Sequence, residues 1–92
     1  MYVTIAAATA DAQVDLEAAR VHAAATAARL RIWTRRAALF EGTPRAGEAA
    51  ASLEEAMSVD KTAREALNAA VLAVAALRTH HRSFRPTLAT TK

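Results

Sequence analysis

The three histidines are the residues with the clearest capacity for metal chemistry. His80 and His81 are adjacent, whereas His22 is distant in the sequence. Neighbouring residues on a helix point about 100° apart, so the pair cannot chelate one ion without unwinding the helix. If the chain folds back on itself, His22 lies about 18 Å from His80 along the helix axis, at about 1.5 Å per residue. The sequence therefore predicts no metal site and no cofactor.

The remaining polar residues predict no catalytic site. Glu54 and Glu55 are neighbours that do not share a helix face, so they do not form a general acid–base pair. The chain has no glycine-rich phosphate loop and no recognisable Ser–His–Asp arrangement. It has no cysteine, which excludes thiolate chemistry and disulfides. We therefore expect a protein that is not an enzyme.

The composition predicts long helices. Alanine supplies 27 of the 92 residues, whereas glycine and proline supply two each. Alanine is the best helix former, and glycine and proline are the poorest. Large apolar side chains are scarce, and a chain of this length buries only a modest part of its surface. We expect its stability to depend on long helix contacts or on association.

One break divides the chain near its middle. The segment 41–47 contains both glycines and one of the two prolines. Gly42 fits the residue after a helix C-terminus, and Thr43-Pro44 fits the start of the next helix. We predict a single all-α domain over residues 1–92, folded as an antiparallel two-helix hairpin. Its parts are helix one over about 9–40, a turn over 41–47, helix two over about 48–82 and an extended tail over 83–92.

Two apolar stripes follow the first predicted helix, one with alternating steps of four and three residues and the other with nearly the same spacing. The first stripe, which Arg35 interrupts, consists of Val14, Ala18, Val21, Ala25, Ala28, Ile32 and Leu39. The second stripe consists of Leu16, Ala19, Ala23, Ala27, Leu30, Trp33, Ala37 and Phe40. At about 100° per residue, the two stripes lie on nearly opposite sides of the helix. One stripe can pack on helix two, and the other needs a further surface.

We assign the first stripe to helix two and the second stripe to a partner protein. Trp33 lies in the second stripe, and tryptophan is enriched at the energetic centres of protein interfaces. The sequence does not distinguish this assignment from its exchange. Either way, the uncovered stripe is rich in alanine, so we expect another helix to approach it closely. The hairpin would then complete a helical bundle by oligomerisation or partner binding.

The net charge of +3 makes a nucleic-acid partner an alternative. Folding the chain about residues 43–47 places Arg36 near Glu54, and Arg29 near Asp60. Arg35 would likewise lie near Glu55, so carboxylates of the same hairpin would neutralise much of the basic charge. The basic residues left for nucleic acid or an acidic partner are Arg31, Arg45, Arg82, Arg85 and Lys92. Because they are scattered over both ends, nucleic acid is not the favoured partner.

Neither a membrane span nor a cleaved signal peptide is expected. The longest uncharged stretch near the end of helix two, Ala66 to Leu77, is too short to cross a bilayer. The N-terminal segment lacks the basic region and apolar core of a signal peptide. Cytoplasmic, particle-associated and non-classically secreted locations all remain compatible with the sequence.

The residues Phe40-Glu41-Gly42 stand at the mid-chain break. An aromatic-x-Gly turn between two helices, in a small chain with a short tail, resembles the WXG100 (ESX-type) family of small secreted proteins. The resemblance would imply a four-helix bundle of two hairpins, exported by a type VII secretion system. The chain departs from the family pattern at Phe40, where the family has Trp, and in its tail, which lacks the Tyr-x-x-x-Asp/Glu export signal.

The favoured prediction is a non-enzymatic helical structural or interaction subunit. It would self-associate or pack into a larger multi-protein assembly, such as a virion-type particle. The alternatives are a WXG100-like exported dimer and a basic helical protein associated with nucleic acid.

Overall fold

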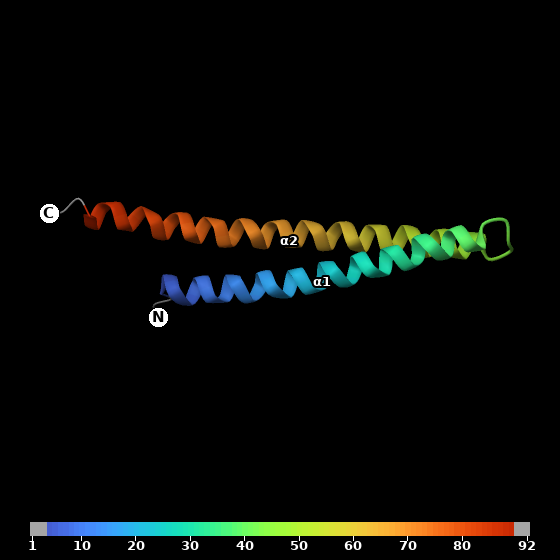
Figure 1. Ribbon diagram of the computed structural model, residues 1–92, viewed down its shortest axis with the longest axis horizontal. Coiled ribbons are helices and arrows are strands. Elements are labelled where there is room, and N and C mark those ends of the chain that lie inside the picture. The colour runs from blue at the N-terminus through green and yellow to red at the C-terminus, as the bar shows by residue number, and fades with distance from the viewer. Residues whose placement is uncertain (1–3, 90–92) are drawn as a thin grey trace.

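The computed structural model describes residues 4–89, and the side chains of residues 4–79. Helix α1 spans Ile5–Phe40 and helix α2 spans Ala46–Ala89. The two helices run antiparallel and lie side by side, joined by a short turn (Figure 1). The described residues contain no strand. The predicted all-α hairpin is therefore confirmed.

Helix α1 begins at Ile5, earlier than the predicted start near residue 9. Thr4 is its N-cap: its backbone is extended, and its Oγ1 accepts a hydrogen bond of 3.0 Å from the amide of Ala7. This bond satisfies one of the amides that the first helical turn leaves without a partner. The alanines that follow favour the helix strongly, so the first turn forms as soon as the cap is in place.

The turn covers residues 41–45 and depends on Gly42. This glycine has a φ of 78°, the only positive φ among the described residues. An L side chain is strained in that conformation, whereas glycine adopts it freely. The amide of Thr43 then donates to the carbonyl of Phe40 at 3.0 Å, and the amide of Ala46 to the carbonyl of Thr43 at 3.1 Å. These bonds reverse the chain and start α2 at Ala46.

Helix α2 continues to Ala89, whereas the sequence predicted an end near residue 82 and an extended tail over 83–92. Pro86 removes one backbone hydrogen bond, a local cost that does not prevent the backbone from continuing as a helix. The last three residues of the predicted tail, 90–92, lie outside the described residues. Because α2 is longer than α1, its C-terminal part extends past the first residues of α1 (Figure 1).

The molecule is a rod. Its dimensions are 76 × 26 × 13 Å and its radius of gyration is 20.9 Å. A compact domain of this length would have a radius of gyration of about 12 Å. Each helix therefore packs on one neighbour only, and much of its surface faces solvent.

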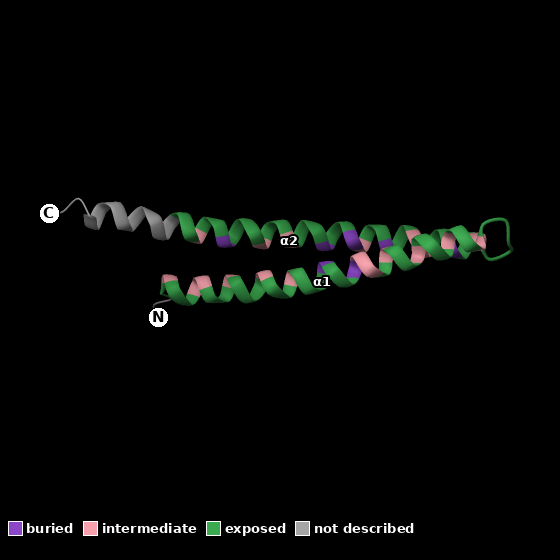
Figure 2. Ribbon diagram, viewed as in Figure 1, coloured by how far each residue is buried: buried purple, intermediate pink, exposed green. Residues whose placement is uncertain are grey.

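The contact between the helices is built from small side chains. The buried apolar residues of α2 include Ala49, Ala56 and Ala63, each no more than 3% exposed. Their spacing of seven residues is the repeat that keeps one helix face against its neighbour. Ala23 of α1 and Val74 of α2 complete the buried apolar set, and Figure 2 shows the buried positions on the facing sides of the helices. Alanine buries little area, so the hydrophobic stabilisation of this seam is modest.

Candidate interaction surfaces

The second stripe, which the sequence analysis assigned to a partner protein, faces α2. All eight of its residues are buried or half-buried: Leu16, Ala19, Ala23, Ala27, Leu30, Trp33, Ala37 and Phe40. Leu16 lines a groove together with Val74 of α2, and Trp33 lines another together with Ala49. The predicted partner surface is thus the inner seam of the hairpin.

The structure therefore reverses the predicted assignment: the second stripe, not the first, packs on α2. The first stripe lies on the side of α1 that is turned away from α2, where Val14 is 67%, Val21 61%, Ile32 46% and Leu39 72% exposed. Arg35 provides one physical reason. It interrupts the first stripe, so packing that stripe on α2 would bury a guanidinium group at high cost. The second stripe has no such interruption.

A buried polar contact gives a second reason for the exchange. Thr26 lies on the face of the second stripe and is 6% exposed, and Asp60 of α2 is 5% exposed. The Thr26 hydroxyl lies 3.0 Å from Asp60 Oδ1 and also 3.0 Å from the carbonyl oxygen of Ala23. Arg64 donates from Nε to Asp60 Oδ2 at 3.1 Å. If the first stripe faced α2, Thr26 would lie on the outer side of α1 and Asp60 would lose this hydroxyl as a donor.

The Thr26–Asp60 contact also defines the register of the hairpin. Facing residues have numbers that add to about 86, whereas the charge pattern predicted about 90, a difference of roughly one helical turn. The ion pairs of the described side chains are local: Arg20–Glu17 at 4.0 Å, Arg45–Glu48 at 3.9 Å and Arg64–Asp60 at 3.1 Å. The predicted pairs between helices, including Arg29 with Asp60, are not among them.

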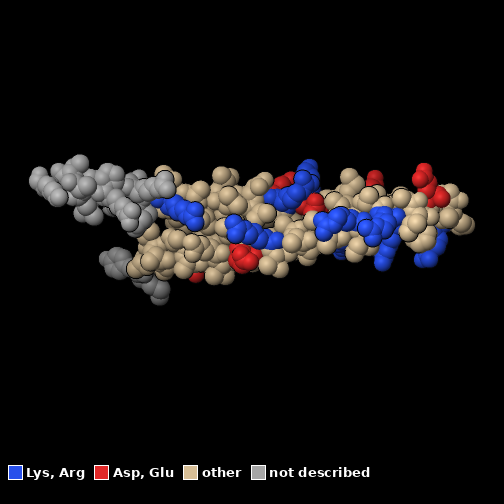
Figure 3. Space-filling view, in the orientation of Figure 1, with Lys and Arg blue, Asp and Glu red and all other residues tan. Residues whose placement is uncertain are grey.

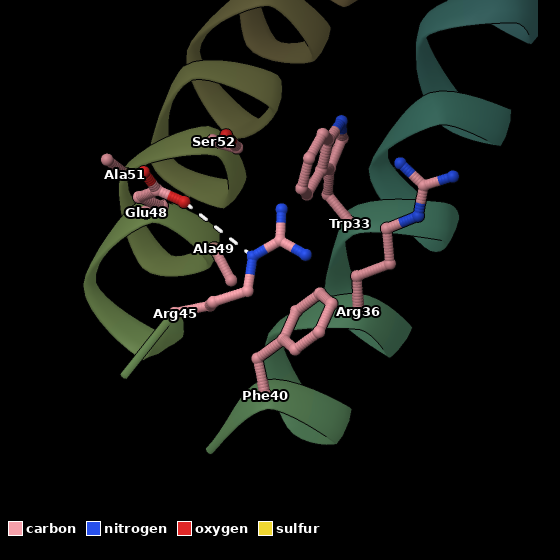
Figure 4. A pocket seen from close by; sticks show the side chains of 8 residues that line it. All are labelled: Trp33, Arg36, Phe40, Arg45, Glu48, Ala49, Ala51 and Ser52. Atoms are coloured by element: carbon pink, nitrogen blue, oxygen red, sulfur yellow. Dashed lines mark ion pairs between the residues drawn. The ribbon is translucent and has the colours of Figure 1, made fainter. Parts of the chain in front are cut away.

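Near the turn, the inner seam opens into a groove of about 620 Å³ (Figure 4). Trp33 and Phe40 line one side, and Ala49 lies on the other. The Cζ of Arg36 lies 5.0 Å from the centroid of the Trp33 ring, and that of Arg45 lies 5.3 Å from the Phe40 centroid. Both distances suit cation–π contacts. The groove exists because two large rings face small side chains, and Arg45 at its border lies 3.9 Å from the carboxylate of Glu48.

The structure describes the side chains of only two of the five basic residues that the charge pattern left without a carboxylate. Arg31 and Arg45 are exposed, and Arg45 lies over Phe40 and beside Glu48. The side chains of Arg82, Arg85 and Lys92 lie outside the described residues. On the face drawn in Figure 3, basic side chains occur along the rod and lie closest together toward the turn, with acidic side chains beside some of them.

Among the described side chains, no three His, Asp or Glu residues come together in a way that could hold a metal ion. Within that same part of the chain, neither helix has a stretch long and apolar enough for a membrane crossing.

The first stripe lies on the outer side of α1 and is interrupted only at Arg35. Val14, Ala18, Val21 and Ala25 line a shallow apolar hollow there, which Glu17 and His22 border. Ile32 and Leu39 continue the stripe toward the turn.

Helix α2 is different. Its exposed large apolar residues are Met57, Val71 and Leu72, and Val71 lines the same groove as Leu16. Exposed charged residues, Lys61 and Arg64, lie between Met57 and the other two. Among the described side chains, the first stripe, although interrupted at Arg35, is therefore the longer line of exposed large apolar residues.

The buried contact between Thr26 and Asp60 was not predicted from the sequence, which placed Asp60 near Arg29 instead. A signal was present, because Asp60 falls among the apolar positions of α2, three residues before Ala63 and four after Ala56. Thr26 likewise lies three residues after Ala23 and four before Leu30. Two polar residues at inward positions of facing helices indicate a buried contact, since a buried polar group needs a partner.

The fold defines an elongated, antiparallel two-helix hairpin with an alanine-rich inner seam and an apolar outer stripe. No family model, curated protein or solved structure matches the chain. Its surfaces are therefore the basis for assigning a function.

Proposed function

We propose that this protein is a non-enzymatic helical subunit that acts by packing the first stripe of α1 against another helix. The observation that carries the proposal is the exposure of Val14, Val21, Ile32 and Leu39 in one line on a single helix face. Covering such side chains with a partner removes apolar surface from water, at about 25 cal/mol per Å². Large apolar patches of this kind mark interaction surfaces.

The small inner seam supports the same proposal. Of the five buried apolar residues among the described side chains, four are alanines and one is Val74. Small folds with little buried apolar area generally gain stability from association, metals or disulfides. The chain has no cysteine, which leaves no disulfide to supply that stability. A partner helix on the first stripe would convert the two-helix rod into a bundle and add the missing buried area.

A substitution on the first stripe tests this proposal. Ala25 is exposed on the outer side of α1, and Ala25→Glu would place a charge in the middle of the contact. We expect the variant to keep its helical circular dichroism and to lose association in sedimentation equilibrium. Ala38→Glu is the matched control, because Ala38 is exposed on α1 and lies off both stripes. Unchanged association of Ala25→Glu would refute the proposal.

The turn favours one more specific candidate, a WXG100-like protein exported by a type VII secretion system as a helical dimer. Phe40 is the last residue of α1, and Gly42, two residues later, has a φ of 78°. This places the aromatic-x-Gly sequence at the reversal of the hairpin. Export by such a system that is lost on changing Phe40 to Ala, with helicity retained, would support this candidate. Absence of export of the unaltered chain would rule it out.

A further inference from the structure

The first stripe has nearly the same order of large and small apolar residues in both chain directions. Counted from a point between residues 26 and 27, an apolar residue on one side matches an apolar residue of similar size at the same distance on the other side. The matched positions are Val14 with Leu39, Val21 with Ile32, and Ala25 with Ala28. The one exception is Ala18, which is matched with Arg35.

We propose that a second copy of this chain covers the first stripe, with the two α1 helices antiparallel about a two-fold axis level with residues 26 and 27. This inference rests on the proposed function and names its partner. A two-fold contact is self-complementary, so each pair of facing residues occurs twice.

The sizes of the side chains fit this arrangement. Val14 would pack against Leu39 of the second copy, and Val21 against Ile32; all four are at least 46% exposed in the single hairpin. At the centre, Ala25 would face Ala28, which allows the two helices to approach closely. The stripe has the seven-residue repeat that keeps two helices in contact along their length. The contact would extend over about 37 Å, at about 1.5 Å per residue from Val14 to Leu39.

Arg35, which interrupts the stripe, acquires a role in this dimer. It would lie opposite Ala18 of the second copy, next to Glu17. Glu17 and Arg35 share one edge of the stripe, because their separation equals five full turns of 3.6 residues. Two-fold symmetry places the same edge of the stripe from both copies side by side. Glu17 of each copy would therefore lie next to Arg35 of the other. In the single hairpin Glu17 has only an exposed contact of 4.0 Å with Arg20, and Arg35 makes no ion pair with the side chains of residues 4–79.

Charge also selects the direction of packing. The N-terminal half of α1 carries Asp11, Asp15 and Glu17, and the C-terminal half, next to the turn, carries Arg29, Arg31, Arg35 and Arg36. Antiparallel α1 helices place the acidic half of each against the basic half of the other. Parallel helices would place like charges together, which disfavours that pairing.

The chain has no cysteine, so disulfide trapping can test the geometry directly. Val14→Cys and Leu39→Cys variants, mixed and oxidised mildly, should form the mixed disulfide between positions 14 and 39. Each variant alone should not cross-link, because its two cysteines would lie about 37 Å apart and a disulfide needs Cα atoms within about 7 Å. Both positions are exposed, so the hairpin should fold in each variant.

The matched control uses the neighbouring exposed positions off both stripes. A mixture of Gln13→Cys and Ala38→Cys should give little mixed disulfide under the same conditions. Disulfides between two copies of the same variant would overturn the antiparallel arrangement. Absence of the 14–39 disulfide in a protein that still associates would also overturn it, while leaving the proposed function intact. A folded monomer would overturn both.

A charge reversal tests the role of Arg35 independently. Glu17→Arg should weaken the dimer about two- to thirty-fold, since two exposed ion pairs are lost for each dimer. Adding Arg35→Glu to the same chain restores opposite charges and should return the dissociation constant to within about three-fold of the original. Equal weakening in the single and double variants would contradict the Glu17–Arg35 contact.

Discussion

The Thr26–Asp60 contact gives the inner seam its specificity. Alanine repeats such as Ala49, Ala56 and Ala63 would pack almost equally well if α2 slid by seven residues. A buried carboxylate does not tolerate such a slide, because it would lose the Thr26 hydroxyl that lies 3.0 Å away. Buried polar groups are best attested in this role of setting register.

Replacing Thr26 with Val tests how much the hydroxyl contact with Asp60 stabilises the hairpin. The substitution keeps the shape of the side chain but leaves Asp60 with Arg64 as its donor partner. We expect the free energy of unfolding in urea to fall by about 1–3 kcal/mol. Thr34→Val is the control, because Thr34 is exposed on the same helix and bonds only its own backbone, at Leu30. Equal losses for Thr26→Val and Thr34→Val would show that the contact with Asp60 contributes nothing.

Helix α1 carries an apolar surface on each of two opposite sides. The inner side is complete within the hairpin, where Ala23 is 9% exposed, and the outer side is open, where Val14 is 67% exposed. Both sides have a seven-residue period, so both can follow the same gentle supercoil. If α1 packs between α2 and a partner helix, as proposed, the partner would cover the apolar residues of α1 that the hairpin leaves exposed.

A charge on the inner side of α1 should damage the hairpin itself. Ala23→Glu would place a carboxylate in the seam of α1 and α2, where Ala23 is only 9% exposed. We expect a loss of at least about 2 kcal/mol in the free energy of unfolding. Thermal melts followed by circular dichroism would show it. Ala25→Glu, two residues away on the opposite side, supplies the comparison. A native melting temperature for Ala23→Glu would mean that the second stripe does not face α2.

The elements were predictable because they depend on local signals. Alanine favours helix everywhere in the chain, and Gly42 permits the one positive φ that the reversal requires. The existence of two stripes on α1 also follows from spacing alone. Which stripe faces α2 depends on residues far apart in the chain, namely Arg35 and the Thr26–Asp60 pair. The predicted ion pairs failed because exposed pairs contribute too little free energy to set a register.

At the scale of the whole molecule, the rod cannot gain stability from further layers of its own. Its smallest dimension is 13 Å, close to the diameter of one helix. Association through the first stripe would thicken the rod into a bundle and link its stability to concentration. The chain would then be a building block whose function begins with assembly.

The mass of the purified chain in solution tests the central claim most directly. Sedimentation equilibrium is suitable because it does not depend on shape, whereas a rod of 76 Å elutes anomalously in gel filtration. At micromolar concentration we predict a mass of at least twice the 9.7 kDa of one chain. A fully helical, well-folded species of 9.7 kDa under the same conditions would contradict the account.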